Sequence, residues 1–490
     1  MSNQAKKITP ALPRGMRDYL PDQMAVRQKI IETLRRVFEL YGFQPLETPA
    51  MERLEVLSGK YGEEGEKLSF RVMKRGAELE RALEKVKAGE APVSELCDMG
   101  LRYDLTVPLA RVVAMYRDKL PLPFKRYQIG PVWRADRPQH GRYREFTQCD
   151  VDIVGTEELS YHTKFMDAEI LCLVMDVFSA LNIEIDIRIS SRKLLEEICE
   201  ISGISNDKFD DFCQALDKYD KGGMKLVVED LKLRGINLST QGIIFLRELS
   251  ELNTSKIILS IDQIKNKIVN NSKGEFQDSI GCFDLKELFE TIFSLRPSMA
   301  SKFLLFDPML ARGLDYYTGT IFEITTKDKN LRQSFGSIGG GGRYDGLVEK
   351  FIDKSFPAIG ISFGIDRIID ILLIEGKEIE MATGGAIAII SQSQDSPHTP
   401  SPQSISQAGY VQDLLHLKGI SAYISPYYGY RLGKQIETAV RMKARFVLII
   451  EDGVSIDKED VSFGIKRLST GEQRRLTLDE AVKWIKETEQ

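Results

Sequence analysis

The chain has 490 residues, of which 42% are hydrophobic and 28% charged, a composition typical of a globular protein with two or three domains. Its formal net charge of −5 argues against a protein that coats nucleic acid with its whole surface, although phosphate binding depends on local patches. One such patch lies between Lys125 and Arg144, where six basic residues accompany a single acid, Asp136.

Neither the cysteines nor the apolar runs indicate an extracellular or membrane protein. The six cysteines are scattered without a CxxC pair, so we expect neither a disulfide framework nor a zinc site. The N-terminal stretch "MSNQAKKITPALPRGM" lacks the apolar core of a signal peptide, and no later run approaches membrane-spanning length. We therefore expect a cytoplasmic protein without membrane contact.

The first predicted element is a helix from Asp22 to about Tyr41. Apolar side chains recur there at helical spacing, and Gly42 follows as a C-terminal cap. The stretch "FQPLETPAME" is predicted to be extended and to be interrupted by Pro49. Residues 124–155 predict two antiparallel strands joined by a loop that contains "PQHG".

From about residue 190 to 308 the pattern becomes helical, which predicts a helical insertion between parts of a sheet. Strands are expected to resume around Gly319 and to continue through residues 337–351 and 357–373. The last hundred residues alternate strands with helices, which predicts a separate α/β domain with a largely parallel sheet. Its polar stretch "SQSQDSPHTPSPQS", residues 391–404, is predicted to be a flexible loop.

Acidic and amide residues alternate in two short stretches. If "LRYDLTVPLAR" is a strand, Asp104 and Thr106 share one face, and in "QCDVDIVG" Gln148, Asp150 and Asp152 do the same. Because a buried carboxylate without a partner is costly, such a row either faces solvent or meets a cation. Each stretch taken alone favours an ordinary solvated strand face.

Arg134, in "VWRADRPQHGRYREF", is a candidate for binding an anion. An arginine opposite a returning strand with Arg142 and Phe146 could grip a phosphate with two hydrogen bonds while the ring stacks a base. A solvated basic hairpin explains the same stretch equally well when it is taken alone.

The glycine run from Gly339 to Gly342 is not a phosphate-binding loop of the Walker type, because no Lys-Ser or Lys-Thr follows it. It is better interpreted as backbone that a ligand or another strand must approach closely. A surface turn is the alternative.

The stretch "ARGLDYYTGTIFE", Ala311 to Glu323, places Arg312 and the pair Tyr316 and Tyr317 just before an alternating run typical of a strand. A cation and two phenols at the mouth of a strand could bind something anionic and something planar. A turn at the surface would carry the same residues.

Taken together, these stretches resemble the histidyl-tRNA synthetases, a family of class II aminoacyl-tRNA synthetases, over nearly the whole chain. The first helix with "FQPLETP" resembles motif 1, the dimer element. "FKRYQIGPVWRADRPQHGRYREF" resembles motif 2, and "PAIGISFGIDRI" resembles motif 3. "ARGLDYYTGTIFE" is similar to the element peculiar to the histidine-specific enzymes.

The resemblance implies an α+β catalytic domain built on an antiparallel sheet, the class II synthetase fold, over residues 1–380. A helical insertion would occupy about 195–300 and, by hypothesis, clamp the acceptor arm of the tRNA. Residues 381–490 would form an α/β anticodon-binding domain, a resemblance carried by "RLGKQIETAVRMKARFVLIIED" and "STGEQ". Motif 1 implies a homodimer.

The implied activity is the ATP-dependent attachment of L-histidine to its cognate tRNA through a histidyl-adenylate, with release of pyrophosphate and AMP. Mg²⁺ is expected on the pyrophosphate side. Because little covalent chemistry falls to the protein, catalysis would rest on positioning and charge neutralisation.

The resemblance also assigns roles to single residues. Arg312 and Arg134 would be catalytic, as cations that hold the α-phosphate. The histidine-binding positions would be Asp104, Leu105, Thr106, Arg134, Gln148, Asp152, Arg312, Tyr316 and Tyr317. The ATP-binding positions would be Arg134, Asp136, Arg142, Phe146 and Arg367. Arg137 and Gln139 would reach the tRNA acceptor end, and no protein side chain is expected to ligate a metal.

Two alternatives share the fold. A non-catalytic, histidine-sensing regulatory subunit of ATP phosphoribosyltransferase resembles the same catalytic core, but such paralogues usually lack the anticodon domain and have eroded motifs. A class II synthetase for another amino acid would share motifs 2 and 3 but should lack "RGLDYY". The retained arginines, paired tyrosines and C-terminal unit favour the histidine enzyme.

Overall fold

The computed structural model describes residues 9–58, 68–138, 143–156, 163–252, 256–272, 278–312, 316–374, 387–392, 402–428, 430–451 and 461–488. The chain forms two compact units, residues 1–19 with 30–377 and residues 20–29 with 378–490. The predicted domain boundary near residue 380 falls between residues 374 and 387, outside the described residues.

The first unit is built on a large mixed sheet. Within the described residues its eight strands follow the order β1-β5-β6-β11-β10-β9-β7-β8. The outermost pairs, β1 with β5 and β7 with β8, are parallel, and the ladders between them are antiparallel. The strands are β1 (Gln44–Pro45), β5 (Phe124–Trp133), β6 (Glu145–Val154), β7 (Ile185–Ser191), β8 (Leu304–Phe306), β9 (Thr320–Thr326), β10 (Ser337–Arg343) and β11 (Ala358–Gly364).

The predicted antiparallel pair in residues 124–155 is confirmed. Strands β5 and β6 pair without interruption, from Phe124 opposite Val154 to Trp133 opposite Glu145. Strand β11 pairs with the other edge of β6, so β6 is an internal strand of the sheet. The side chains of Gln148, Asp150 and Asp152 on it are buried, and the prediction of a solvated strand face is wrong.

Helices cover the back of this sheet. Phe363 of β11 lies 5.9 Å, between ring centroids, from both Phe38 of α1 (Pro21–Leu40) and Phe178 of α6 (Thr163–Ala180). The predicted first helix is thus confirmed, and Gly42 at φ +77° follows it in the left-handed conformation that favours glycine. Apolar burial on this side leaves the opposite face of the sheet for polar side chains.

The prediction of a strand at "LRYDLTVPLAR" is wrong in part. Strand β4 ends at Leu101, and α5 (Thr106–Tyr116) begins at Thr106, so Asp104 lies in the turn between them. A two-residue alternation is too short to distinguish a strand from a turn that starts a helix. The small sheet here has the order β2-β4-β3 and comprises β2 (Met51–Arg53), β3 (Arg71–Met73) and β4 (Cys97–Leu101).

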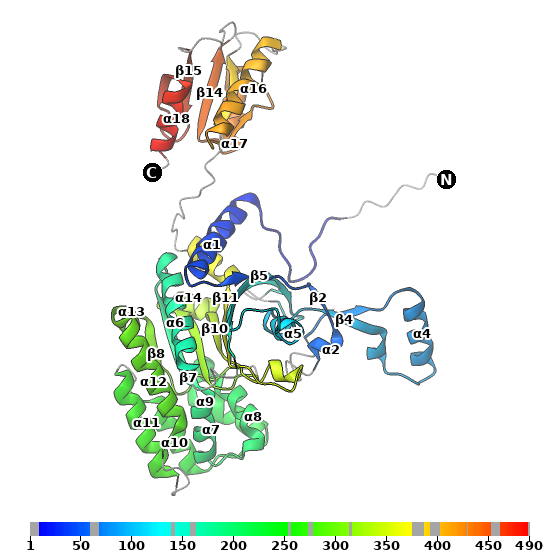
Figure 1. Ribbon diagram of the computed structural model, residues 1–490, viewed down its shortest axis with the longest axis vertical. Helices are drawn as coiled ribbons and strands as arrows, with labels where there is room; N and C mark the ends of the chain where they lie inside the picture. The colour runs from blue at the N-terminus through cyan, green and yellow to red at the C-terminus, as the bar shows by residue number, and fades with distance from the viewer. Residues whose placement is uncertain are drawn as a thin grey trace. The chain divides into compact units, whose positions relative to one another are not determined.

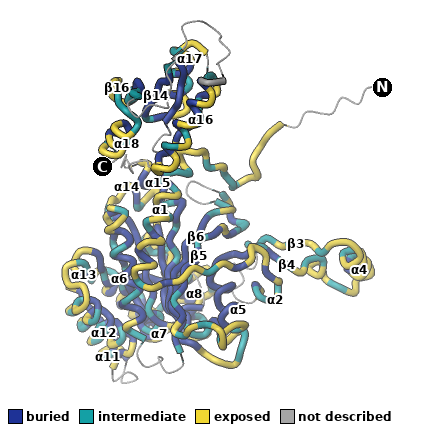
Figure 2. The backbone as a smooth tube through the Cα atoms, turned by 45° about the horizontal axis from the view of Figure 1, so that its top comes forward, coloured by how far each residue is buried: buried dark blue, intermediate teal, exposed yellow. Residues whose placement is uncertain are grey.

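The segment between β3 and β4 carries α4 (Gly76–Lys87) and projects from the body of the unit, with most of its residues exposed (Figures 1 and 2). Two short helices complete this region, α2 (Leu54–Leu57) and η1 (Val93–Leu96).

A helical insertion follows β7, as the sequence predicts, and returns to the sheet at β8 (Figure 1). Its elements are α7 (Arg192–Ile201), η3 (Asn206–Lys208), α8 (Phe209–Leu216), α9 (Tyr219–Leu233), α10 (Thr240–Ser250), α11 (Ile257–Asn271), α12 (Ile280–Leu295) and α13 (Pro297–Phe303). The unit ends with α14 (Lys329–Phe335), η4 (Val348–Lys350) and α15 (Ile365–Ile374). The strand expected over 357–373 therefore stops at Gly364, where α15 begins.

The second unit contains a sheet of order β13-β12-β14-β15-β16. Its elements are β12 (Ile387–Gln392), α16 (Pro402–Leu417), β13 (Ala422–Ile424), α17 (Leu432–Arg441), β14 (Phe446–Glu451), β15 (Ser462–Arg467), β16 (Gln473–Thr477) and α18 (Leu478–Glu487). Only the β13-β12-β14 part is parallel, so the sheet is mixed rather than largely parallel.

A flexible loop is predicted at residues 391–404. β12 runs to Gln392 and α16 begins at Pro402, so both ends of this stretch belong to regular elements, and residues 393–401 lie outside the described part. No helix in the described residues is long and apolar enough to cross a membrane. The six cysteines are free thiols.

Candidate active site

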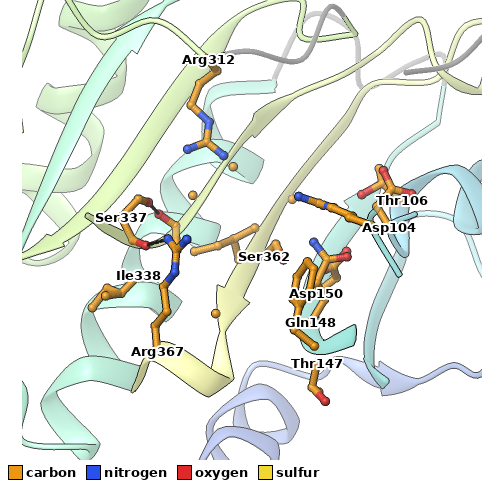
Figure 3. A pocket seen from close by; sticks show the side chains of 18 of the residues that line it. Asp104, Thr106, Thr147, Gln148, Asp150, Arg312, Ser337, Ile338, Ser362 and Arg367 are labelled. Carbon is orange, nitrogen blue, oxygen red and sulfur yellow. Dashed lines mark hydrogen bonds between the residues drawn. The ribbon is translucent and has the colours of Figure 1, made fainter. Parts of the chain in front are cut away.

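A pocket of about 310 Å³ opens on the polar face of the large sheet, over β6, β11 and β10. Figure 3 shows that its polar groups are segregated. Arg312 and Arg367 lie on one side, and Asp104, Thr106, Gln148 and Asp150 lie on the other. A ligand that fits this pocket must therefore carry anionic groups at one end and a cation at the other.

The floor of the pocket is made of backbone, because β10 has glycine where side chains would fill it. A Cβ at Gly341 would lie 2.0 Å from the carbonyl oxygen of Gly360, and one at Gly340 would lie 2.5 Å from Nη1 of Arg312. The interpretation of this run as closely approached backbone is thus confirmed.

Strand register explains why acids and arginines meet over these glycines. Gly340 lies opposite Ser362 of β11, and Ser362 lies opposite Asp150 of β6. One row further along, Gly342 lies opposite Gly360, which lies opposite Asp152. A Cβ at Gly360 would come within 1.9 Å of the Asp152 carboxylate, so glycine leaves the volume that this acid occupies.

A backbone hydrogen bond holds Asp104 on the acidic side of the pocket. Oδ1 of Asp104 accepts a hydrogen bond of 3.1 Å from the backbone N–H of Val107, which caps the start of α5. Asp104, Thr106, Gln148 and Asp152 line the pocket and are buried. Among the described residues, Oε1 of Gln148 and Oδ1 of Asp150 receive no hydrogen bond. Each such buried acceptor costs about 1–3 kcal/mol, which a bound donor such as an ammonium group would recover.

A buried cation, Arg126, lies beside the buried acids. Arg126 of β5 is fully buried, and its Nη2 lies 2.7 Å from Oδ2 of Asp152, its register partner. The hydroxyl of Tyr344 donates a hydrogen bond to the other carboxylate oxygen of Asp152. Burial, with Asp152 and Asp104 nearby, raises the pKa of Asp150 to about 7 although Arg126 opposes the shift. Asp150 thus stays partly protonated near neutrality until a cation arrives.

The two tyrosines of "ARGLDYYTGTIFE" form one wall. Tyr316 and Tyr317 are 9% and 6% exposed, and their ring centroids are 4.9 Å apart. Tyr344 meets Tyr316 edge to face at 6.0 Å, so three phenols enclose the acidic end of the pocket. Burial raises the pKa of Tyr316 well above its usual value, which keeps the phenol a hydrogen-bond donor.

Three arginines from different elements line the pocket. Arg312 follows the turn after β8, Arg134 follows β5, and Arg367 lies on the first turn of α15. Nη1 of Arg312 lies 3.4 Å from Oε1 of Glu323, while Arg367 donates a hydrogen bond to the backbone carbonyl of Ser337 (Figure 3). Guanidinium groups held in this way present fixed donors to phosphate oxygens.

Arg134 is held flat between aromatic rings. Its guanidinium carbon lies 4.3 Å from the ring centroid of Tyr103 and 5.1 Å from that of Phe146, and its Nε donates a 3.1 Å hydrogen bond to the carbonyl of Tyr103. Asp136 is buried and lines the pocket together with Phe146. Arg134 and Phe146 thus lie beside each other across this hairpin, and their contacts with a phosphate and a base remain predictions.

Not every predicted position meets the pocket. Leu105 is buried, does not line it, and instead offers its carbonyl to Arg126 over 3.1 Å. Arg137 is exposed, and Gln139 and Arg142 lie outside the described residues. Their assignments remain predictions.

The structure adds three residues that sequence reasoning did not place. Asp150 and Tyr344 line the pocket, and Arg126 neutralises Asp152 from below. The alternation in "QCDVDIVG" already pointed to Asp150, whereas nothing local in the sequence indicated the long-range contacts of Arg126 and Tyr344.

Comparison with known proteins agrees with this architecture. The family profile for histidyl-tRNA synthetase matches residues 15–81 and 94–368, and the profile for the anticodon binding domain matches residues 387–488. A histidine–tRNA ligase of Phocaeicola vulgatus is 38% identical over 489 residues, covering 97% of this chain and 99% of the relative. One from Azobacteroides pseudotrichonymphae is 44% identical over 368 residues, covering 74% and 75%.

Solved structures show the same fold. The crystal structure of a histidyl-tRNA synthetase from a Nostoc species has a TM-score of 0.76 at 27% identity and covers 98% of this chain and 100% of that chain. A Bacillus halodurans structure titled as an ATP phosphoribosyltransferase regulatory subunit/histidyl-tRNA synthetase has a TM-score of 0.66 at 20% identity and covers 92% and 100%, which shows the shared fold alone. With both domain profiles and nearly full-length relatives in agreement, the chain belongs to the histidyl-tRNA synthetase family, whose members are class II aminoacyl-tRNA synthetases.

Proposed function

We propose that this protein attaches L-histidine to its cognate tRNA in two steps, with ATP as co-substrate and histidyl-adenylate as the intermediate. The observation that carries the proposal is the segregation of charge in one pocket, with buried acids on one side and Arg312 and Arg367 on the other. Histidine is cationic at its ammonium group, and ATP is anionic, so the two substrates match the two ends.

At the acidic end, the ammonium group would be bound by Asp104, Thr106 and Gln148, and the imidazole would lie against Tyr316 with Asp152 as its acceptor. The free acceptors on Gln148 and Asp150 are placed to be satisfied by such a donor-rich ligand. A pocket built to hydrogen-bond a polar ring rejects apolar amino acids, because they would leave these buried groups unpaired.

In the first step, a carboxylate oxygen of histidine attacks the α-phosphorus of ATP, and the bond from that phosphorus to the bridging oxygen of the β-phosphate breaks. Arg312 and Arg134 would hold the α-phosphate oxygens, where charge develops, and Arg367 would hold the leaving pyrophosphate. Phe146 would stack on the adenine. In the second step, a ribose hydroxyl of the tRNA attacks the carbonyl carbon and AMP leaves.

Mg²⁺ would accompany the ATP phosphates and supply further charge neutralisation on the pyrophosphate side. Within the described residues, no group of three or more His, Cys, Asp or Glu side chains is placed to hold a metal ion. We therefore assign Mg²⁺ to the nucleotide as its counter-ion, and the chain's own contribution remains the three arginines.

The remaining partners follow from the family and from the second unit. The anticodon binding domain profile over 387–488 supports tRNA recognition by that unit, and Arg137 and Gln139 would reach the acceptor end. The motif 1 resemblance supports a homodimer, which sedimentation would contradict if it showed only monomer at working concentration. The free thiols are compatible with a reducing cytoplasm.

Histidine-dependent exchange between ATP and pyrophosphate tests the proposal, with Arg312→Ala beside the wild-type chain. Exchange that requires histidine, ignores threonine and proline, and collapses in the variant is the expected result. Histidine binding without any exchange would overturn it in favour of the non-catalytic regulatory alternative.

A further inference from the structure

An unassigned network of charged residues lies directly behind Arg312. It consists of Glu323 on β9, Arg188 on β7, Asp307 after β8, and Asp220 on α9 of the helical insertion. None of these residues lines the pocket, so none is placed to touch a substrate. Their contacts nevertheless lead from the insertion to the arginine that faces the reacting phosphate.

The register of the sheet places the middle of this network in one row. Arg188 lies directly opposite Glu323, and Glu323 lies directly opposite Gly340. Because Gly340 has no side chain, the guanidinium of Arg312 occupies the volume above it. Glu323 thus has a cation on each side, with Nη1 of Arg312 and Nη1 of Arg188 each 3.4 Å from one of its carboxylate oxygens.

The same arginine is anchored on its far side. Nε of Arg188 donates a 2.7 Å hydrogen bond to Oδ2 of Asp307, and Nη2 donates one of 3.1 Å to Oδ1 of Asp220. The side chain of Arg188 is only 14% exposed and that of Glu323 is 19% exposed, so solvent screens their mutual contact weakly, whereas the side chain of Asp220 is 57% exposed and its contact is screened more. Two carboxylates therefore fix the cation that fixes Glu323.

The insertion also acts on Arg312 directly. Burial alone would lower the pKa of the Arg312 guanidinium, but Tyr317, Glu323 and Asp217 raise it above its ordinary value. Asp217 and Asp220 flank the start of α9, so one corner of the insertion supplies negative charge to both arginines.

We propose that Glu323 and Arg188 are positioning residues for Arg312, and that Asp220 ties this ion-pair chain to the helical insertion. Arg312 bears on substrate only if its guanidinium stays over Gly340, and the chain of alternating charges holds it there. A tRNA seated against the insertion would then act on the activation chemistry through Asp220. This inference rests on the proposed function, because it concerns the rate that Arg312 supports.

The decisive experiment is a double-mutant cycle in single-turnover adenylate formation, measured with histidine and ATP both saturating. Glu323→Gln and Arg188→Gln should each lower the rate about tenfold in the wild-type background. In an Arg312→Ala background neither should lower the residual rate further, because both act only through Arg312. Arg188→Lys, which keeps the charge, should recover part of the loss.

Arg332→Gln is the matched control, since Arg332 pairs with Asp186 on the same strand as Arg188, with 2.6 Å between Nη2 and Oδ2. It should lower the melting temperature comparably and leave the rate within twofold. Equal losses in both Arg312 backgrounds, or an equal loss in the control, would mean a purely structural role and overturn the inference. Absence of adenylate from the wild-type chain would instead refute the proposed function.

The link to the insertion has its own test. Asp220→Asn should lower the same rate by about threefold, a smaller factor because Asp307 still holds Arg188. Asp262→Asn breaks a comparable ion pair with Lys286 inside the insertion, with 2.9 Å between its oxygen and nitrogen, and should leave the rate unchanged. If the two substitutions changed the rate equally, Asp220 would not be part of this ion-pair network.

Discussion

At Gly340 the absence of a side chain determines the geometry of the pocket. The hydrogen that stands there in place of a side chain allows the Arg312 guanidinium to lie where a Cβ would be 2.5 Å from Nη1. Real Cβ atoms do not tolerate such a contact, so the arginine and not the strand would have to shift. The position of the Arg312 guanidinium therefore depends on a residue that has no functional group of its own.

Substitution of Gly340 by alanine should thus impair chemistry more than binding. We expect kcat for pyrophosphate exchange to fall by about 10²-fold, because a displacement near 1 Å at a reacting group has an effect of this size. Gly346→Ala is the control, since a Cβ there meets nothing within 4 Å. If both variants keep wild-type kcat, the close approach at Gly340 has no catalytic meaning.

The raised pKa of Asp150 leads to a prediction about how the stability of the protein depends on pH. Its pKa in the folded protein, about 7, lies above the unfolded value of about 3.9. The stability that its protonated form contributes is fully present below about pH 4 and is lost as the pH rises through about 7. Asp150→Asn should therefore raise the melting temperature of the ligand-free protein near pH 8 by a few degrees, and by less near pH 5.

Thermal unfolding across this pH range, with and without histidine, checks the prediction. Histidine should stabilise the wild-type chain more strongly than the asparagine variant near pH 8, because the cationic ligand offsets the buried negative charge that Asp150 carries at that pH and that the variant lacks. A melting difference that does not change with pH would show that Asp150 is not the titrating group.

Among whole elements, the N-terminal segment is tied to the part of the chain that carries Phe146 and Arg367. Nη1 of Arg17 donates a 2.9 Å hydrogen bond to the hydroxyl of Tyr143 and lies 3.3 Å from Asp370, and Nη2 lies 3.4 Å from Asp366. Asp366 also accepts a 2.9 Å hydrogen bond from the backbone N–H of Thr147. The segment thus joins β6 to α15, the elements that carry Phe146 and Arg367.

Arg17→Ala should accordingly weaken ATP binding. We expect the KM for ATP to rise about tenfold while the KM for histidine changes little, because the acidic end of the pocket is untouched. Arg14→Ala, at an exposed position of the same segment, is the control. A uniform loss for both substrates would indicate general loosening of the fold instead.

The elements also differ in how well the sequence predicts them. The β5–β6 hairpin, the first helix and the helical insertion have long periodic patterns, and all three were predictable. Asp104 was assigned to a strand because two alternating residues cannot distinguish a strand from a helix start. Arg126 and Tyr344 reach Asp152 only through strand register and tertiary packing, which no local pattern encodes.

At the scale of the whole molecule, the pocket and the match to the anticodon binding domain fall on different units. The pocket is lined entirely by residues of the first unit. The second unit carries an aromatic pair beside a cation, with Nζ of Lys434 4.5 Å from the ring centroid of Tyr427 and 5.6 Å from that of Tyr430. Tyr430 is exposed and Tyr427 partly so, and accessible aromatic rings with a basic neighbour suit unpaired bases and their phosphates.

Tyr430→Ala and Lys434→Ala should therefore affect only the tRNA-dependent reaction. The KM for tRNA should rise about tenfold in aminoacylation, and pyrophosphate exchange should stay at the wild-type rate. Lys483→Ala, an exposed lysine on α18 of the same unit, serves as the control. An unchanged KM for tRNA would move anticodon contact elsewhere on this unit.

The glycine floor also constrains how this protein can diverge. Any missense change in the codons for residues 340–342 adds at least one carbon atom where backbone or an essential side chain already stands. Almost no substitution at these three positions of the strand would therefore leave the pocket unchanged, whatever the chemistry of the new residue. A lineage that acquired a different amino-acid preference would have to alter the rim, at positions such as Gln148 or Tyr316, and inherit the floor unchanged.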